Sequence, residues 1–151
     1  MAKFVVSGLI ELQKEIAKIS ELDNGALAKE MLRKGSEDVA RVWHEEAQRR
    51  HNKHTGNMNR SIDSTKPKKN KIGRYTVTYP MGTERRIRHG VEVTMRDAAK
   101  AFYQHYGYIN PWNGRFYPGD RWVEIIDMRS EPLVDKTMQS VFDKWLQSNQ
   151  K

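Results

Sequence analysis

The chain has 151 residues, a formal net charge of +8 at pH 7 and no cysteine. This length is typical of one domain with its own core, so we expect a single domain over residues 1–151. The lack of cysteine excludes disulfide bonds and thiolate metal sites, and it fits a reducing cytoplasm. The apolar stretches are too short to cross a membrane, and residues 1–8 lack the apolar region of a signal peptide.

The positive charge is concentrated in the middle of the chain. Residues 48–90 hold twelve of the 27 Lys and Arg residues but only two of the 19 acidic residues, Asp63 and Glu84. This segment therefore carries +10, whereas the rest of the chain carries −2. A positive segment of this size attracts polyanions and acidic protein surfaces.

Helices are predicted in the first third of the chain. After a short strand at residues 3–6, apolar residues recur at spacings of three and four, which predicts an amphipathic helix capped by Ser7: Leu9, Leu12, Ile16 and Ile19. A longer helix is predicted near residues 24–50, with Asn24 as its cap. Gly35 occupies an apolar position of that helix, which is tolerated where another backbone packs closely.

The middle third changes to a strand pattern. Residues 51–56 form a polar break, and Thr55 is placed to cap a turn running to residue 62. Alternation with a period of two then predicts strands at residues 72–79 and 90–94. Residues 66–71 are the predicted hairpin tip and residues 80–89 a longer loop, so most of the positive charge falls on turns.

The last third is predicted to end in a helix. Residues 97–103 fit either a helical turn or a strand, and the aromatic segment 106–122 fits a structured loop. Asp120 is a candidate cap for a turn, and Ser130 followed by Glu131 and Pro132 signals a helix that ends near residue 147. The predicted fold is α+β, with N-terminal and C-terminal helices packed on a small antiparallel sheet.

Patterns for catalysis are weak. His51 and His54 lack further metal ligands, and His44 lacks the second histidine of a metalloprotease helix. No nucleophile elbow or phosphate loop occurs. A nuclease-like acidic set is conceivable, but such spacing arises often by chance: Glu84, Glu92 and Asp97 with Lys100. We therefore expect no enzyme activity, no catalytic residue, no metal and no cofactor.

The basic segment offers a candidate binding surface. Its residues on the predicted turns and strand would face either the phosphate backbone of DNA or an acidic protein partner: Lys66, Lys68, Lys69, Lys71, Arg74, Arg85, Arg86 and Arg88. A purely solubilising role is the third interpretation. Base-specific recognition is not expected, because these residues are not on an evident groove helix.

The aromatic segment offers a second candidate surface. Its rings would either stack on single-stranded bases or form a core or subunit contact, and we favour an assembly interface: Tyr106, Tyr108, Trp112, Phe116, Tyr117 and Trp122.

Four stretches, taken in order, resemble the tail-completion or neck proteins of long-tailed bacteriophages and prophages. They are residues 6–13 (VSGLIELQ), 54–62 (HTGNMNRSI), 102–107 (FYQHYG), and 118–119 (PG) with the final helix. The second stretch is similar to the most recognisable element of the family, a threonine-glycine followed by a hydrophobic residue and serine-isoleucine.

The resemblance implies a structural virion protein without catalysis. It implies a homo-oligomeric ring, for example a hexamer, that contacts other neck and tail proteins at the head–tail junction and lets DNA pass transiently. Assembly would take place in the host cytoplasm, without a membrane. Five residues would then act as structural turn positions: Thr55, Gly56, Gly107, Pro118 and Gly119. A stand-alone nucleic-acid-binding protein is the alternative, and a metal-dependent nuclease is the remaining rival.

Overall fold

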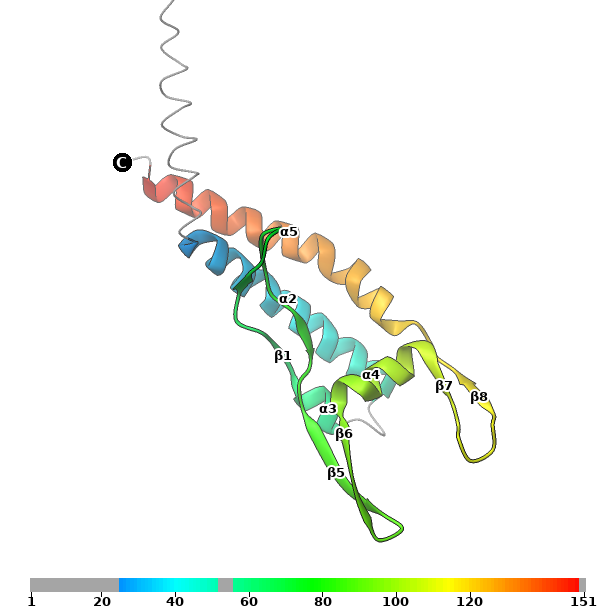
Figure 1. The fold of residues 1–151 in the computed structure, drawn as a ribbon. Helices are drawn as coiled ribbons and strands as arrows, with labels where there is room; N and C mark the ends of the chain where they lie inside the picture. The colour runs from blue at the N-terminus through cyan, green and yellow to red at the C-terminus, as the bar shows by residue number, and fades with distance from the viewer. Residues whose placement is uncertain (1–24, 52–55, 150–151) are drawn as a thin grey trace, which may run out of the picture.

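The computed structural model describes residues 25–51 and 56–149. The predictions for residues 1–24, the cap assigned to Thr55 and the position of His54 lie outside the described residues. The fold is α+β, as predicted (Figure 1).

Two long helices form the body of the structure. Helix α2 spans Ala26–His51 and helix α5 spans Trp122–Asn149, and the two run antiparallel, side by side (Figure 1). The helix predicted near 24–50 is therefore confirmed. A Cβ on Gly35 would lie 3.0 Å from Met138 Cε and 3.1 Å from Val134 Cγ1, so side chains of α5, rather than the backbone expected from the sequence, pack against this glycine.

Helix α5 begins earlier than predicted. Pro132 lies inside the helix rather than in its first turn, so the start signal at residues 130–132 was wrong. Trp122 and Ile126 are fully buried and extend the apolar face of α5 by two turns. Burial of these side chains offsets the cost of an interior proline, which is about 3 kcal/mol. Pro132 has no N–H to donate to the carbonyl of Met128. Met128 is an exposed residue, so this missing hydrogen bond lies on the solvent side of the helix.

The core lies at the end of the helical pair where the strands attach. Trp43 of α2 and Trp122 of α5 meet edge to face, with ring centroids 5.0 Å apart. Around them lie buried side chains from both long helices and from α3 (Gly56–Arg60), β1 (Ile62–Ser64) and α4 (Asp97–Tyr106): Val42, Ala47, Met58, Ile62, Ala101 and Ile126. The core thus joins the helices to the base of every hairpin that follows.

Among the described residues the strands form four separate two-stranded antiparallel ladders rather than one sheet. The pairs are β1 with β4 (Thr78–Pro80), β2 (Lys68–Lys69) with β3 (Arg74–Tyr75), β5 (Thr83–Arg88) with β6 (Val91–Arg96), and β7 (Gly107–Ile109) with β8 (Phe116–Pro118). The first two pairs make one long ribbon that lies along α2, and the other two project from the helices (Figure 1).

Two predicted turns differ from the structure. The ribbon turns at residues 70–73, where the Asn70 side chain accepts hydrogen bonds from the amides of Ile72 and Gly73, both 2.9 Å long. Lys68 and Lys69 therefore lie in strand β2 rather than at the tip. Residues 83–88, predicted as loop, form strand β5, which alternation did not reveal because the strand is exposed on nearly all sides.

Two segments whose secondary structure the sequence did not decide, residues 97–103 and 106–122, contain regular elements in the structure. Residues 97–103 belong to helix α4, and the aromatic segment contains the β7–β8 hairpin. In the part of the chain that the structure describes, no helix combines the length and apolarity that crossing a membrane requires.

Candidate interaction surface

Two hairpins project from the same region of the molecule. We call β5–β6 (residues 83–96) the first arm and β7–β8 (residues 107–118) the second arm. Both extend away from the α2 and α5 pair, and α4 connects them (Figure 1). One side chain from each tip approaches the other, because the rings of His89 and Trp112 have centroids 6.4 Å apart.

A buried polar cluster holds the base of the first arm. The Asp97 carboxylate is 2% exposed and accepts hydrogen bonds from the Ser61 hydroxyl at 2.8 Å and from Lys100 at 2.7 Å. The Asp97 amide donates to the Gly82 carbonyl at 2.9 Å. A Cβ on Gly82 would lie 2.2 Å from the Asp97 carboxylate, so this glycine permits the close approach.

The candidate nuclease residues are only partly brought together. Lys100 also pairs with Glu84, and hydrogen bonds from Arg86 and Lys100 lower the pKa of Glu84 to about 2. Glu92 lies on the opposite face of the arm, 3.7 Å from Arg85. No cluster of three His, Asp or Glu suited to a metal occurs among the described residues.

Close backbone packing holds the base of the second arm. His105 is buried, and its Nδ1 accepts a hydrogen bond of 3.2 Å from the Val123 amide in the first turn of α5. A Cβ on Gly119 would lie 2.2 Å from the His105 carbonyl oxygen, and one on Gly107 would lie 2.3 Å from the Tyr117 carbonyl oxygen. These two glycines occupy positions that larger residues would disrupt, whereas Pro118 lies exposed in β8.

The predicted aromatic interface divides between surface and core. Tyr108 and Tyr117 stack across the second arm with centroids 5.3 Å apart, and Trp112 at its tip is 84% exposed. Tyr106 and Phe116 are exposed as well. Trp122, by contrast, is completely buried against Trp43, so its assignment to an assembly surface was wrong. Its position at the start of α5 places it in the core.

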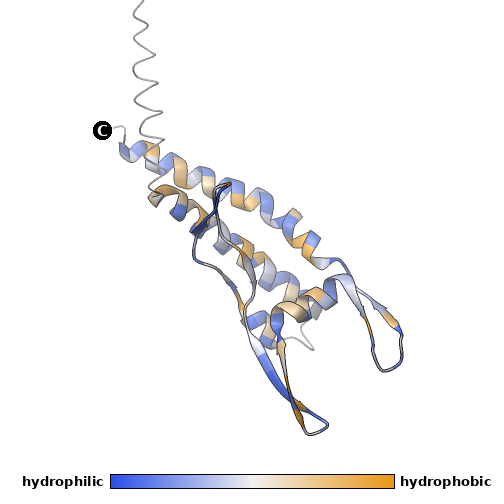
Figure 2. Cartoon of the chain, viewed as in Figure 1, coloured by the Kyte–Doolittle hydropathy of each residue, from blue (hydrophilic) through white to orange (hydrophobic). Residues whose placement is uncertain are grey.

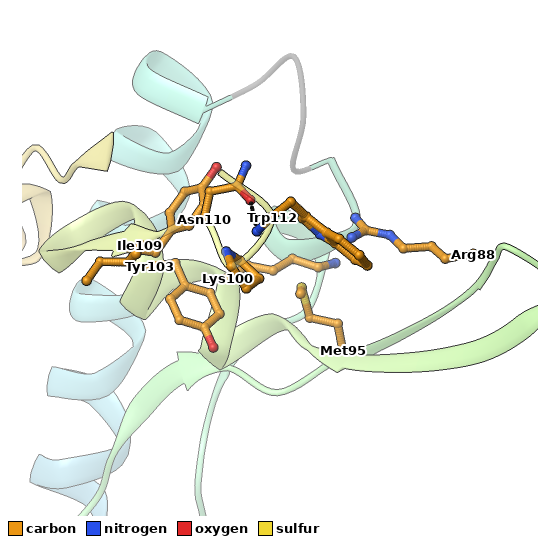
Figure 3. A pocket seen from close by; sticks show the side chains of 9 residues that line it. Arg88, Met95, Lys100, Tyr103, Ile109, Asn110 and Trp112 are labelled. Atoms are coloured by element: carbon orange, nitrogen blue, oxygen red, sulfur yellow. Dashed lines mark hydrogen bonds between the residues drawn. The ribbon is translucent and has the colours of Figure 1, made fainter. Parts of the chain in front are cut away.

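A groove of about 620 Å³ lies between the two arms. Arg88 and Met95 line it from the first arm, Lys100 and Tyr103 from α4, and Ile109 and Trp112 from the second arm (Figure 3). The sequence did not reveal Met95 or Ile109 as surface residues, although the period of two in β6 assigns Met95 to the same face as Val91 and Val93.

The predicted basic surface separates into two parts. The first part belongs to the ribbon along α2 and consists of Arg74 and four exposed lysines, Lys66, Lys68, Lys69 and Lys71. The Arg74 guanidinium packs against Gly25. Arg85, Arg86 and Arg88 belong to the first arm. Figure 2 shows the polar strand β5 beside the more apolar strand β6.

A further charged cluster ties the helical pair together. The Glu46 carboxylate is 1% exposed and accepts hydrogen bonds from Arg49, Arg50 and Arg129. Burial raises the pKa of Glu46, but these hydrogen bonds outweigh it and hold the value at about 2. Arg129 also pairs with Glu45 at 2.6 Å, so α5 is attached to α2 by charge as well as packing.

Comparison of the chain with protein-family models, with curated proteins and with solved structures finds no match in any of the three.

Proposed function

We propose that this chain is a tail-completion protein of the neck of a long-tailed phage or prophage. It acts by assembling into a ring at the head–tail junction rather than by catalysis. The resemblance of four ordered sequence stretches supports this function, and the arrangement of the two arms supports assembly as its mechanism.

The apolar side chains exposed on the arms carry the proposal. Ile87 and Val91 on the first arm, and Ile109, Trp112 and Phe116 on the second, are all more than half exposed. An isolated two-stranded hairpin is only marginally stable in water, and contiguous exposed apolar surface marks sites of protein contact. Neighbouring subunits that cover the arms would stabilise both hairpins.

The basic ribbon suits a channel that passes DNA. Lys66, Lys68, Lys69 and Lys71 are exposed on one hairpin, so a ring repeats this cluster in every subunit. Repeated cations attract the phosphate backbone without selecting a base sequence. The protein would then reside in the virion and contact other neck and tail proteins.

Electron microscopy tests the proposal directly. Purified full-length protein, alone and mixed with tails that lack it, is imaged by negative stain. We expect rings in solution or a ring capping the tail. A chain that forms no ring and caps no tail at any concentration contradicts the proposal.

Stand-alone nucleic-acid binding is the alternative, because the exposed lysines of the ribbon would also meet naked DNA. It predicts tight, strongly salt-dependent DNA binding by the monomer. The neck function predicts weak DNA binding by the monomer. Replacement of all four ribbon lysines with glutamine should leave ring formation intact and impair DNA passage. Unchanged phage yield would leave the lysines a solubilising role only.

A further inference from the structure

Resting on the ring assembly proposed above, we propose which two surfaces of the chain meet in the ring. The tips of the two arms of one subunit dock on the outer face of helix α5 of the next subunit. The partner is thus a second copy of this chain, bound head to tail.

The docking surface on the arms is a small set that we call the tip cluster: Arg88, Val91 and Trp112. Val91 lies directly across the arm from Arg88 and is 63% exposed, and Trp112 lies beside the turn of the first arm through its contact with His89. His89 and Gly90 both have positive φ, 50° and 77°, as a two-residue hairpin turn of type I′ requires. Tryptophan and arginine surrounded by apolar side chains are typical of the energetic centres of protein interfaces.

Arg88 differs from the other arginines of β5. Arg85 pairs with Glu92, and Arg86 pairs with Glu84. Arg88 forms no ion pair with any residue that the structure describes, and it lines the groove next to Trp112 (Figure 3). The tip cluster therefore offers one unpaired cation within an apolar surface, which selects a partner surface that is apolar and acidic.

Helix α5 presents such a surface, which we call the outer ridge: Glu124, Met128, Glu131 and Asp135. The spacings of four, three and four place these residues on one face of the helix, opposite the buried Ile126 and Ser130. Met128 is 66% exposed at the centre of this face.

Glu124 of the outer ridge is already paired with Arg121 at 3.6 Å, whereas the other two carboxylates of the ridge are available to a partner. Glu131 and Asp135 form no ion pair within the described ranges 25–51 and 56–149. The nearby Arg129 is already bound by Glu45 and Glu46. The two available carboxylates beside an exposed methionine match an arginine next to apolar side chains in charge and in chemistry.

The positions of the two surfaces favour a ring. The arms project away from the α2 and α5 pair, so their tips extend toward a neighbouring molecule (Figure 1). Contact between two different surfaces of identical chains is heterologous, and such contacts generate rings when the rotation closes. Nucleic acid is a poorer occupant, because a single unpaired arginine neutralises only one phosphate.

Charge reversal tests the contact. Arg88→Glu and Glu131→Arg are each expected to weaken assembly about tenfold or more, measured by sedimentation velocity, because each places like charges opposite one another. The double variant R88E/E131R should recover most of the lost assembly, since the charges are then exchanged. Lys29→Glu and Asp143→Arg make the same charge changes at exposed sites outside both surfaces and should assemble as wild type does.

The outcomes separate this contact from the neck function. Far-ultraviolet circular dichroism establishes that each variant is folded. If R88E and E131R assemble normally, or if the double variant recovers nothing, the contact is wrong while wild-type rings still support the neck function. If R88E assembles poorly while E131R assembles normally, the tips dock on a different surface of the chain, which also overturns the contact. A wild-type chain that never assembles contradicts both proposals.

Discussion

The helical pair and the arms use aromatic residues in opposite ways. Trp43 and Trp122 are buried against each other between α2 and α5, whereas Trp112 and its neighbours on the second arm face outward. The same residue type therefore stabilises the single chain in one region and is left exposed in the other. Removing one aromatic ring from each region should distinguish residues that stabilise the fold from residues that are available to bind a neighbouring subunit.

The largest effect is expected at Trp122. Trp122→Ala removes a completely buried ring and leaves a cavity beside Trp43, so the free energy of unfolding should fall by about 3–5 kcal/mol. Trp112→Ala should change it by no more than about 0.5 kcal/mol, because that ring is exposed. Urea unfolding followed by circular dichroism measures both. Similar losses in the two variants would contradict the division between core and arms.

The next effect concerns the charge that ties α5 to α2. The pKa of Glu46 is lowered from 4.5 to about 2 in the folded chain, so its stabilising contribution is complete above pH 4.5 and is lost as pH falls toward 2. The contribution is on the order of 3 kcal/mol.

Glu46→Gln tests this contribution. The variant should be less stable than wild type at pH 7, and the difference should shrink between pH 4.5 and 2, as measured by urea midpoints across that range. Exposed Asp143→Asn provides the control, with little change at any pH. A difference between Glu46→Gln and wild type that does not vary with pH would contradict the role of the carboxylate.

A smaller effect is expected at the base of the second arm. Gly119→Ala places a Cβ 2.2 Å from the His105 carbonyl oxygen and should cost about 1–3 kcal/mol through backbone displacement. Gly73→Ala has no heavy atom within 4 Å of its new Cβ and should be neutral or slightly stabilising. Thermal unfolding of the two variants measures the contrast, and equal midpoints would show that the second arm is not held at this point.

Prediction from sequence succeeded where burial imposes a period. Helix α2 was found because its apolar residues recur along one face, whereas the close backbone approach expected at Gly35 is instead a contact with side chains of α5. Strand β5 was missed because it is exposed and therefore carries no alternating pattern. The start of α5 was misplaced because Pro132 is a strong local signal that core packing by Trp122 and Ile126 overrides.

The candidate surface was predictable only in part. The exposed aromatic residues and the basic segment were recognised from composition, but Trp122 was assigned to the wrong region. The meeting of His89 with Trp112 joins residues that are far apart in the sequence, and no local pattern indicates it. Arg88 was grouped with its neighbours because ion pairs to Glu84 and Glu92 become evident only in three dimensions.

The attachment of both arms to one short helix has a mechanical consequence. Each arm is attached to α4 at its base, whereas the tips are linked only by the ring contact of His89 with Trp112. Because Trp112 stays 84% exposed, that contact buries little surface, and a force applied at either tip acts mainly on the base of the same arm. In the proposed ring, a load on the tips would therefore be carried by α4 of each subunit.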